Sequence, residues 1–204
     1  MTVRRLAIPL SERRAQGFCP PSPRLAAVAL ALFLALVSGS AAQAQSSDDA
    51  LRLGPLGILT REASVLDVGA GVYDLIGNAH RNETSAADAE LRLGRRWGGI
   101  GPAVGTIVDF RGGGMGYVGI DSDLALGPVV VTPLLGLGAW WRGGNDDENL
   151  GGTFQFRLSL EAAYAFAGGS RLGVRFGHIS NGDIHKVNPG ENDVMVTYGL
   201  PLGL

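Results

Sequence analysis

The stretch TFQFRLSLEAAYAFA (residues 153–167) alternates between apolar and polar side chains along most of its length. Every second residue from Phe154 onward is apolar or aromatic, and the residues between them include Gln155, Arg157 and Glu161. A period of two residues is that of a β-strand with two different faces, because an amphipathic helix repeats every 3.6 residues. The stretch therefore predicts a strand between an apolar and a polar environment.

Seven further segments have strand character, and no segment shows a helical period over helical length. Glycine supports this interpretation, since the chain has 32 glycines spread through its apolar runs. Glycine destabilises helices, whereas in strands it marks bends and close backbone approach. The eight expected strands span residues 64–75, 87–97, 102–110, 115–126, 129–141, 153–167, 171–180 and 193–202. We predict an all-β fold.

The expected connections alternate in length. Short turns follow the second, fourth and sixth strands, and longer polar loops follow the first, fifth and seventh. This pattern is typical of an outer-membrane barrel with both termini in the periplasm, so we predict an eight-stranded antiparallel transmembrane β-barrel in the bacterial cell outer membrane. The interior of such a barrel is filled by side chains, which places any function on its outside or its loops. A soluble periplasmic β-barrel is the alternative, because its strands would also alternate.

The first 44 residues have the composition of a cleaved signal peptide. A basic region precedes the apolar run LAAVALALFLALV (residues 25–37), and Ala42-Gln43-Ala44 matches a cleavage site before Gln45. The long basic region is also compatible with a start codon further downstream. The expected organisation is a signal peptide over 1–44, an N-terminal periplasmic lead-in over 45–63 and the barrel over 64–204.

The composition of the mature chain excludes several classes of function. Cys19 is the only cysteine and precedes the cleavage site, so the mature chain has no disulfide, no cysteine-ligated metal and no cysteine nucleophile. The mature chain carries 12 of the 17 basic and 18 of the 19 acidic residues, a net charge of −6 without a basic patch. This balance argues against a nucleic-acid partner. We expect no metal and no cofactor.

Segment RLGVRFGHIS (residues 171–180) ends in two polar residues on an otherwise apolar face. Alternation places His178 and Ser180 on the lipid side, at the outer end of a strand that rises from the periplasm. Neighbours on one face of a strand are about 6.6–7 Å apart at Cα, a gap that side chains can close. A neutral imidazole there can take the serine proton and activate the hydroxyl. The pair predicts a nucleophile that faces outer-leaflet lipid, although this spacing also occurs at a polar strand rim.

The sequence HISNGDIHKVNPGENDVMVTYGLPL (residues 178–202) resembles the carboxy-terminal signature of the PagL-type lipid A 3-O-deacylases. That signature reads roughly His-x-Ser-Asn-(Ala/Gly), a short loop, Asn-Pro-Gly or Asn-Asp-Gly, and a final strand; SVLDVGAGVYDL (residues 64–75) is similar more loosely. The resemblance implies an outer-membrane serine esterase that hydrolyses the 3-O-linked acyl chain of lipid A with a Ser-His-Glu triad and no metal. Lipid A, or lipopolysaccharide, of the outer leaflet is then the substrate, and a second copy of the chain is a candidate partner in a homodimer.

The resemblance also implies roles for individual residues. Ser180 is the nucleophile and His178 the general base, while Asn181 and Gly182 supply the oxyanion hole, Asn181 by its side chain or its backbone N–H. The family's glutamate falls 14 residues after the histidine, where this chain has Asn192.

Three interpretations of the third triad member remain. Glu191 turns outward through the preceding Pro-Gly turn, Asp193 reaches the histidine through a shifted register, or Asn192 itself contacts it. We predict Glu191. Two other functions compete with the esterase: a non-catalytic barrel used for adhesion or envelope integrity, and an outer-membrane phospholipase.

Overall fold

The computed structural model describes residues 50–60, 63–75, 83–144 and 148–202. The predicted signal peptide lies outside these residues. Within them the chain forms only strands, turns and loops: β1 (Ala50–Leu53), β2 (Leu56–Leu59), β3 (Ser64–Tyr73), β4 (Thr84–Arg92), β5 (Ile100–Asp109), β6 (Gly114–Ser122), β7 (Leu124–Leu126), β8 (Val129–Trp141), β9 (Phe154–Ala165), β10 (Arg171–Ser180) and β11 (Glu191–Leu202). No helix long and apolar enough to cross a membrane occurs in this part of the chain.

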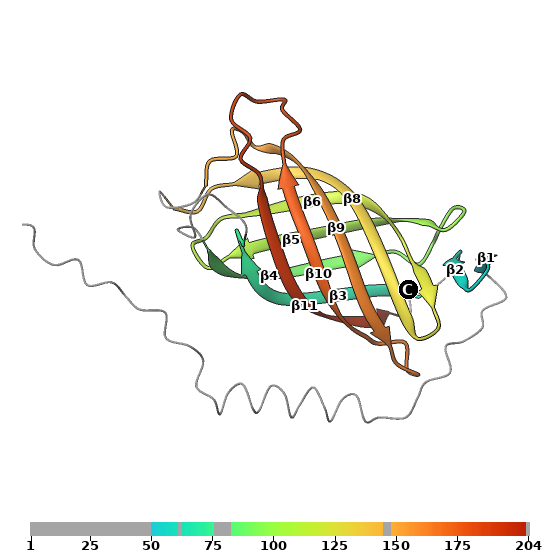
Figure 1. Cartoon of the computed structure of the whole chain (residues 1–204). Coiled ribbons are helices and arrows are strands. Elements are labelled where there is room, and N and C mark those ends of the chain that lie inside the picture. Colours follow the sequence, from blue (N-terminus) through green and yellow to red (C-terminus); the bar gives the residue numbers. More distant parts are fainter. Residues whose placement is uncertain (1–49, 61–62, 76–82, 145–147, 203–204) are drawn as a thin grey trace, which may run out of the picture. The chain divides into compact units, whose positions relative to one another are not determined.

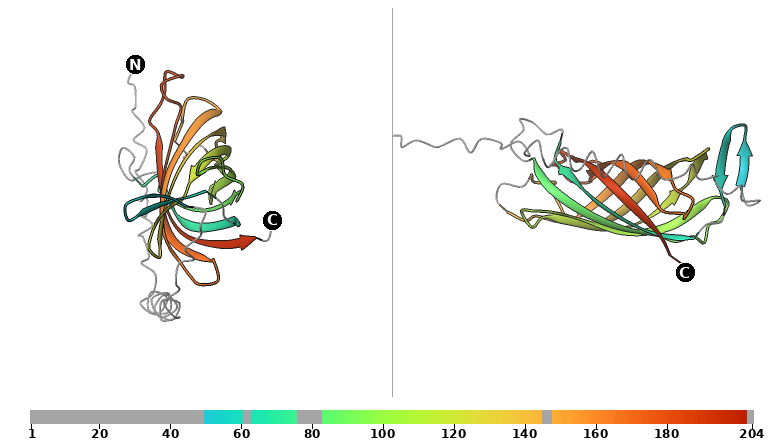
Figure 2. Two further views of the ribbon diagram at one scale, coloured as in Figure 1. Left: turned by 90° about the vertical axis from the view of Figure 1, so that its right-hand side faces the viewer. Right: turned by 90° about the horizontal axis from the view of Figure 1, so that it is seen from below.

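Strands β3 to β11 close into an antiparallel barrel. Strands β3 to β6 pair in sequence order, as do β8 to β11, while β11 pairs with β3 and β6 pairs with β8. Strand β7 continues β6 along the edge of β8, so the two together form the predicted fourth strand. Figures 1 and 2 show that these strands are tilted and arranged around one barrel axis. The prediction of an eight-stranded antiparallel barrel is confirmed.

A short hairpin that was not expected from the sequence pattern lies in the expected lead-in. Strands β1 and β2 pair with each other, and β2 continues the sheet by pairing with β7. Ile58 of this hairpin packs closely against Gly99. A Cβ added to Gly99 would lie only 2.3 Å from the Cγ2 methyl group of Ile58. The hairpin therefore packs against the β4–β5 turn at the end of the barrel opposite to the long loops.

The lumen contains a network of buried charges. Arg175 contacts Asp67 at 2.9 Å, Asp88 at 2.5 Å and Glu161 at 2.7 Å. Arg92 contacts Glu161 as well, at 2.8 Å. These side chains come from β3, β4, β9 and β10, and each is nearly or fully inaccessible to solvent. Buried charges are tolerated only when they are paired, so the network ties strands across the barrel to one another.

The outward face of the wall is apolar. The alternation predicted for residues 153–167 is confirmed, because Gln155, Arg157 and Glu161 are buried in the lumen while Leu158 and Leu160 are half exposed. In the described barrel strands, no outward position carries Asp, Glu, Lys or Arg. The large exposed side chains of this face include Val68, Val104, Val108, Val118, Ile120, Leu135, Leu137, Val174, Phe176, Val196 and Leu200. An apolar belt around a polar interior is the pattern of a barrel that is surrounded by lipid.

Candidate active site

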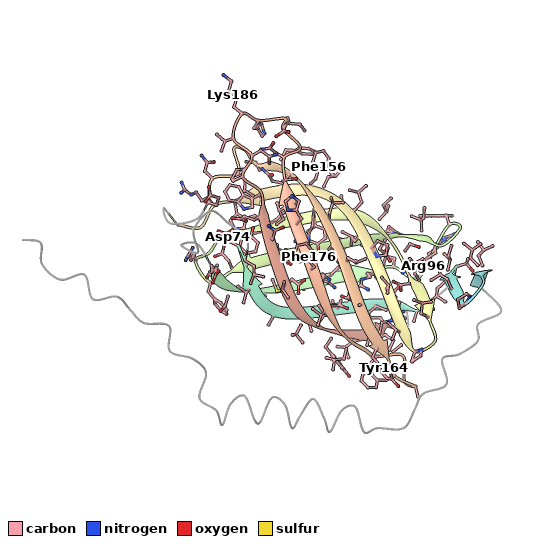
Figure 3. All side chains as sticks on the ribbon, in the orientation of Figure 1. Asp74, Arg96, Phe156, Tyr164, Phe176 and Lys186 are labelled. Carbon is pink, nitrogen blue, oxygen red and sulfur yellow. The ribbon has the colours of Figure 1, made fainter. Side chains whose placement is uncertain are left out.

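Strand β10 carries His178 and Ser180 on the lipid-facing side of the wall, as predicted. Its inward residues Arg171 and Arg175 are buried, whereas Val174 and Phe176 on the other face are exposed. His178 and Ser180 continue this outward stripe and are half-buried. Figure 3 shows the ring of Phe176 on the outer face below the loop that carries Lys186. The two polar residues thus lie at the long-loop end of the barrel, on its outer surface.

The register of β11 determines which side chain meets the imidazole. His178 is paired with Asn192, and Nδ1 of His178 lies 2.9 Å from Oδ1 of Asn192. The side chains on either side of Asn192, those of Glu191 and Asp193, point into the lumen. Asp193 accepts two hydrogen bonds from the Arg157 guanidinium, at 2.7 and 3.1 Å, and both residues are fully buried. A paired buried carboxylate is costly to displace, so Asp193 fixes the outward direction of its neighbour Asn192.

The position predicted for Glu191, turned outward against His178, is wrong. Glu191 begins β11 without a change of face, is 3% exposed and lies beside the buried Tyr73. The strand keeps its alternation from Glu191 onward because the Pro189-Gly190 turn is completed before it. The shifted register considered for Asp193 does not occur either. Of the three candidates, the structure brings Asn192 to the histidine.

Gly190 lies against the other edge of the imidazole. It has a φ of +70°, and a Cβ added to it would lie 2.9 Å from Cε1 and 3.5 Å from Nε2 of His178. Glycine is favoured where φ is positive, and here the absence of a side chain also leaves room for the ring. Asn192 and Gly190 therefore hold the imidazole from two directions.

Ser180 is two residues beyond His178 on the same face and pairs with Phe156 of β9. In the described chain no hydrogen bond joins the Ser180 hydroxyl to His178. The separation of same-face neighbours, about 6.6–7 Å at Cα, allows the two side chains to meet after rotation of the serine χ1. Nucleophile–base hydrogen bonds are often long before substrate binds and tighten in the complex. The arrangement is that of a serine next to an imidazole whose ring is oriented by Asn192.

The side chain and the N–H of Asn181 are committed to other groups, which corrects the expectation that either one faces an oxyanion. Asn181 is fully buried, and its amide donates to the carbonyls of Leu150 at 2.8 Å and Val187 at 2.7 Å. Its backbone N–H donates to Oδ1 of Asn188 at 3.0 Å. Asn181 therefore joins the β8–β9 loop to the β10–β11 loop and stabilises the loop that follows Ser180.

Gly182 is the remaining candidate for the oxyanion hole. It is exposed, has a φ of +60°, and its N–H has no hydrogen-bond acceptor within the described residues. A side chain at this position would meet the ring of Phe156 at 3.3 Å. The bound Asn181 next to it holds this part of the loop in place, so the Gly182 N–H can be presented to a ligand above Ser180.

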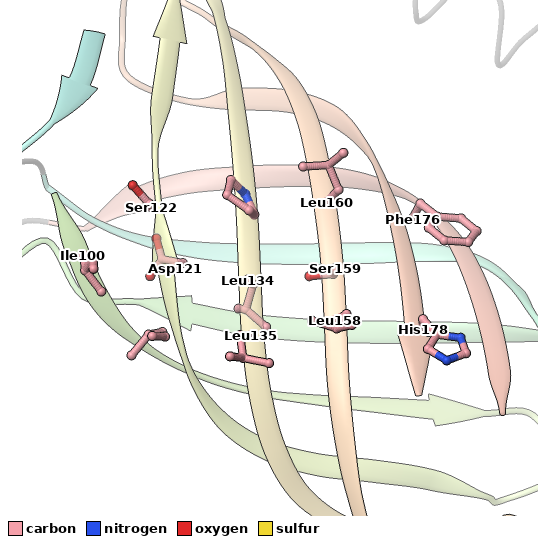
Figure 4. A pocket seen from close by; sticks show the side chains of 12 residues that line it. Ile100, Asp121, Ser122, Leu134, Leu135, Leu158, Ser159, Leu160, Phe176 and His178 are labelled. Atoms are coloured by element: carbon pink, nitrogen blue, oxygen red, sulfur yellow. The ribbon is translucent and has the colours of Figure 1, made fainter. Parts of the chain in front are cut away.

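An apolar groove runs along the outer wall from His178. It encloses about 620 Å³, within the ~300–1,000 Å³ typical of ligand sites. Its floor follows one row of paired residues, from His178 to Leu158 of β9, Leu135 of β8 and Ile120 of β6. Figure 4 shows Phe176 and Leu160 beside this row. The groove offers an extended apolar surface that begins at the imidazole.

The described residues contain no group of three or more His, Cys, Asp or Glu side chains arranged to hold a metal ion. The groups that the site presents are the Ser180 hydroxyl, the His178 imidazole with Nδ1 hydrogen-bonded, and the backbone N–H of Gly182.

The family model described as Lipid A 3-O-deacylase (PagL) matches residues 73–201. The crystal structure of the outer membrane enzyme PagL superposes with a TM-score of 0.53 at 20% identity, covering 68% of this chain and 99% of that one. Neisserial surface protein A gives a TM-score of 0.48 at 11% identity, covering 69% and 98%. No curated protein sequence matches the chain.

Proposed function

The chain belongs to the lipid A 3-O-deacylase (PagL) family, and we propose that it hydrolyses the ester-linked 3-O-acyl chain of lipid A in the outer leaflet of the outer membrane. The observation that carries this proposal is the outward placement of Ser180 and His178, with His178 lining one end of an apolar groove. A lipid-facing nucleophile can reach only substrates that lie in or at the bilayer. A groove lined by Leu158, Leu135 and Ile120 is suited to a hydrocarbon chain.

The proposed reaction needs only the groups of the site and water. Oγ of Ser180 attacks the ester carbonyl carbon as its proton passes to Nε2 of His178. The negative charge then develops on the former carbonyl oxygen, to which we expect the Gly182 N–H to donate a hydrogen bond. When the carbon–oxygen bond to the sugar breaks, His178 returns the proton to the sugar oxygen. Water attacks the acyl-serine in the same way, releasing the fatty acid and restoring the hydroxyl.

The test is the mass of lipid A from cells that express the chain. The wild type is expected to remove one 3-hydroxyacyl group, and Ser180→Ala to lower the rate roughly 10⁶-fold, below detection. Ser85→Ala is the matched control, because Ser85 is also a serine on the outward face at the same end of the barrel. Removal of the Ser85 hydroxyl should leave the loss of one 3-hydroxyacyl mass from lipid A unchanged. An unchanged lipid A mass with folded wild-type protein, in every host tried, rules the proposal out.

A parallel assay of glycerophospholipids with the purified barrel separates the phospholipase alternative. Release of fatty acid from phospholipid but not from lipid A would keep the serine site and replace its substrate. If neither lipid is cleaved and Ser180 does not react, the non-catalytic barrel is the better description.

A further inference from the structure

We infer that Asn192 is the third member of the site, so that this esterase operates with an uncharged Ser-His-Asn arrangement and has no acid. The inference rests on the proposed function for the identity of the nucleophile and base. Asn192 is a positioning residue, because it acts on the substrate only through His178. Its Oδ1 lies 2.9 Å from Nδ1 of the imidazole.

The amide oxygen selects one form of the imidazole. A carbonyl oxygen only accepts hydrogen bonds, so Nδ1 must carry the proton and donate it to Oδ1. Nε2 is then left with its lone pair, which is the form that takes the proton of Ser180. The opposite orientation of the amide would present N–H groups to Nδ1 and protonate Nε2 instead. Asn192 therefore sets whether the histidine is a base.

The flanking carboxylates cannot replace Asn192. Glu191 and Asp193 both point into the lumen, and Asp193 is held there by Arg157. On the adjoining strands the imidazole lies beside Leu158 of β9 and Asn192 of β11, and the backbone of Gly190 lies against its edge. None of these three groups carries a charge. Within the described residues His178 forms no ion pair with a carboxylate, so the imidazolium that forms during the reaction is supported by the dipole of an amide.

The outer wall gives a physical reason for a neutral group at this position. No outward position of the described barrel strands carries a charged side chain, and Asn192 lies on the same face as Val194 and Val196. An ionised carboxylate would be the only fixed charge on the outward face of the described barrel strands. Charges that face lipid are expensive, whereas an amide with a hydrogen-bond partner is far less so. We expect the amide to lower the rate and to favour insertion.

The decisive variant is Asn192→Asp, which keeps the size and shape of the side chain and adds a charge. A carboxylate stabilises the imidazolium, so kcat for lipid A deacylation should rise by roughly tenfold to a hundredfold with little change in KM. The same stabilisation should move the acid limb of the pH–rate profile to higher pH. Asn192→Leu removes the acceptor at similar volume, and kcat should fall by roughly a hundredfold. Asn149→Asp is the control, since it adds the same charge to an exposed loop at the same end and keeps the acceptor for the Gly151 N–H.

The full-length chain, extracted from membranes in detergent, is assayed with lipid A and with a fluorophosphonate that labels activated serines. Folding of each variant is checked by the heat-dependent mobility of the barrel. Deacylation that requires Ser180 but has the same kcat and pH profile in Asn192→Asp and Asn192→Leu overturns the inference and leaves the proposed function standing. Labelling of Ser180 that rises in Asn192→Asp and falls in Asn192→Leu, without lipid A cleavage, supports the inference and overturns the proposed substrate. Absence of both activities in every folded variant overturns both.

Discussion

Asp193 and Asn192 are neighbours in β11, yet they face opposite sides of the barrel wall. Asp193 lies in the lumen, fully buried, with two hydrogen bonds from Arg157, whose guanidinium also stacks 5.3 Å from the centre of the Tyr117 ring. Asn192 lies on the lipid side, half-buried, with a single side-chain hydrogen bond to His178. Asp193 is ion-paired inside the lumen, whereas the side chain of Asn192 is hydrogen-bonded to the His178 ring on an uncharged surface.

The difference shows how the barrel separates stability from chemistry. Strand alternation sends every second side chain to the same face, so a slip of one residue would exchange the two sets. The ion pairs of the lumen make such a slip costly, because it would place paired charges in lipid. Lumenal contacts such as Arg157–Asp193 thereby fix the orientation of residues that they do not touch.

The largest expected effect comes from breaking the lumenal network at its centre. Arg175→Met removes the cation shared by Asp67, Asp88 and Glu161 and leaves their carboxylates buried without it. Loss of one partner from a buried network typically costs about 3–5 kcal/mol of unfolding free energy. Urea unfolding of the detergent-solubilised barrel, followed by mobility on gels, measures the change. Arg95→Met is the control at an exposed position, expected within about 0.5 kcal/mol of wild type; equal losses in both variants would contradict a central role for the network.

On the outer wall we expect a substitution beside His178 to lower the deacylation rate while changing the free energy of unfolding little. Gly190→Ala places a methyl group 2.9 Å from Cε1 of His178, which pushes the ring away from Asn192. A displacement of about 1 Å in a catalytic group costs roughly a hundredfold in kcat. Gly127→Ala serves as the control, because Gly127 has a similar φ of +60° but no atoms within 4 Å of the added methyl group.

Both glycine variants carry the same backbone strain, about 1–2 kcal/mol. Deacylation rates and unfolding midpoints are measured on the two proteins together. If Gly127→Ala loses as much activity as Gly190→Ala, then the strain rather than the contact with His178 is responsible.

The alternation of apolar and polar residues was sufficient to predict most of the fold. It assigned the faces of β9 and β10 correctly, and with them the outward direction of His178 and Ser180. The β1–β2 hairpin was missed because its residues show no such alternation over so short a length, and its strands are defined by pairing with β7.

The error at Glu191 has a specific physical origin. Alternation and the spacing from His178 both pointed to Asn192, but a carboxylate was expected because it is the usual partner of a catalytic histidine. The position of Asn181 could not be read from the strand pattern, since its contacts to Leu150 and Val187 depend on how two loops meet. Contacts within a strand follow from local sequence, whereas contacts between loops follow from the assembled barrel.

The smallest effect is expected at the far part of the groove. Leu135 is two strands away from His178 along the row, about 10 Å at the usual strand spacing, so only a long acyl chain reaches it. Leu135→Ala removes about 1 kcal/mol of apolar contact from such a chain and should lower kcat/KM about fivefold. A butanoyl ester is too short to reach this position and should be cleaved at the wild-type rate. Leu200→Ala, an outward leucine of β11 that does not line the groove, should change neither value. Equal losses with long and short esters would place the acyl chain elsewhere on the wall.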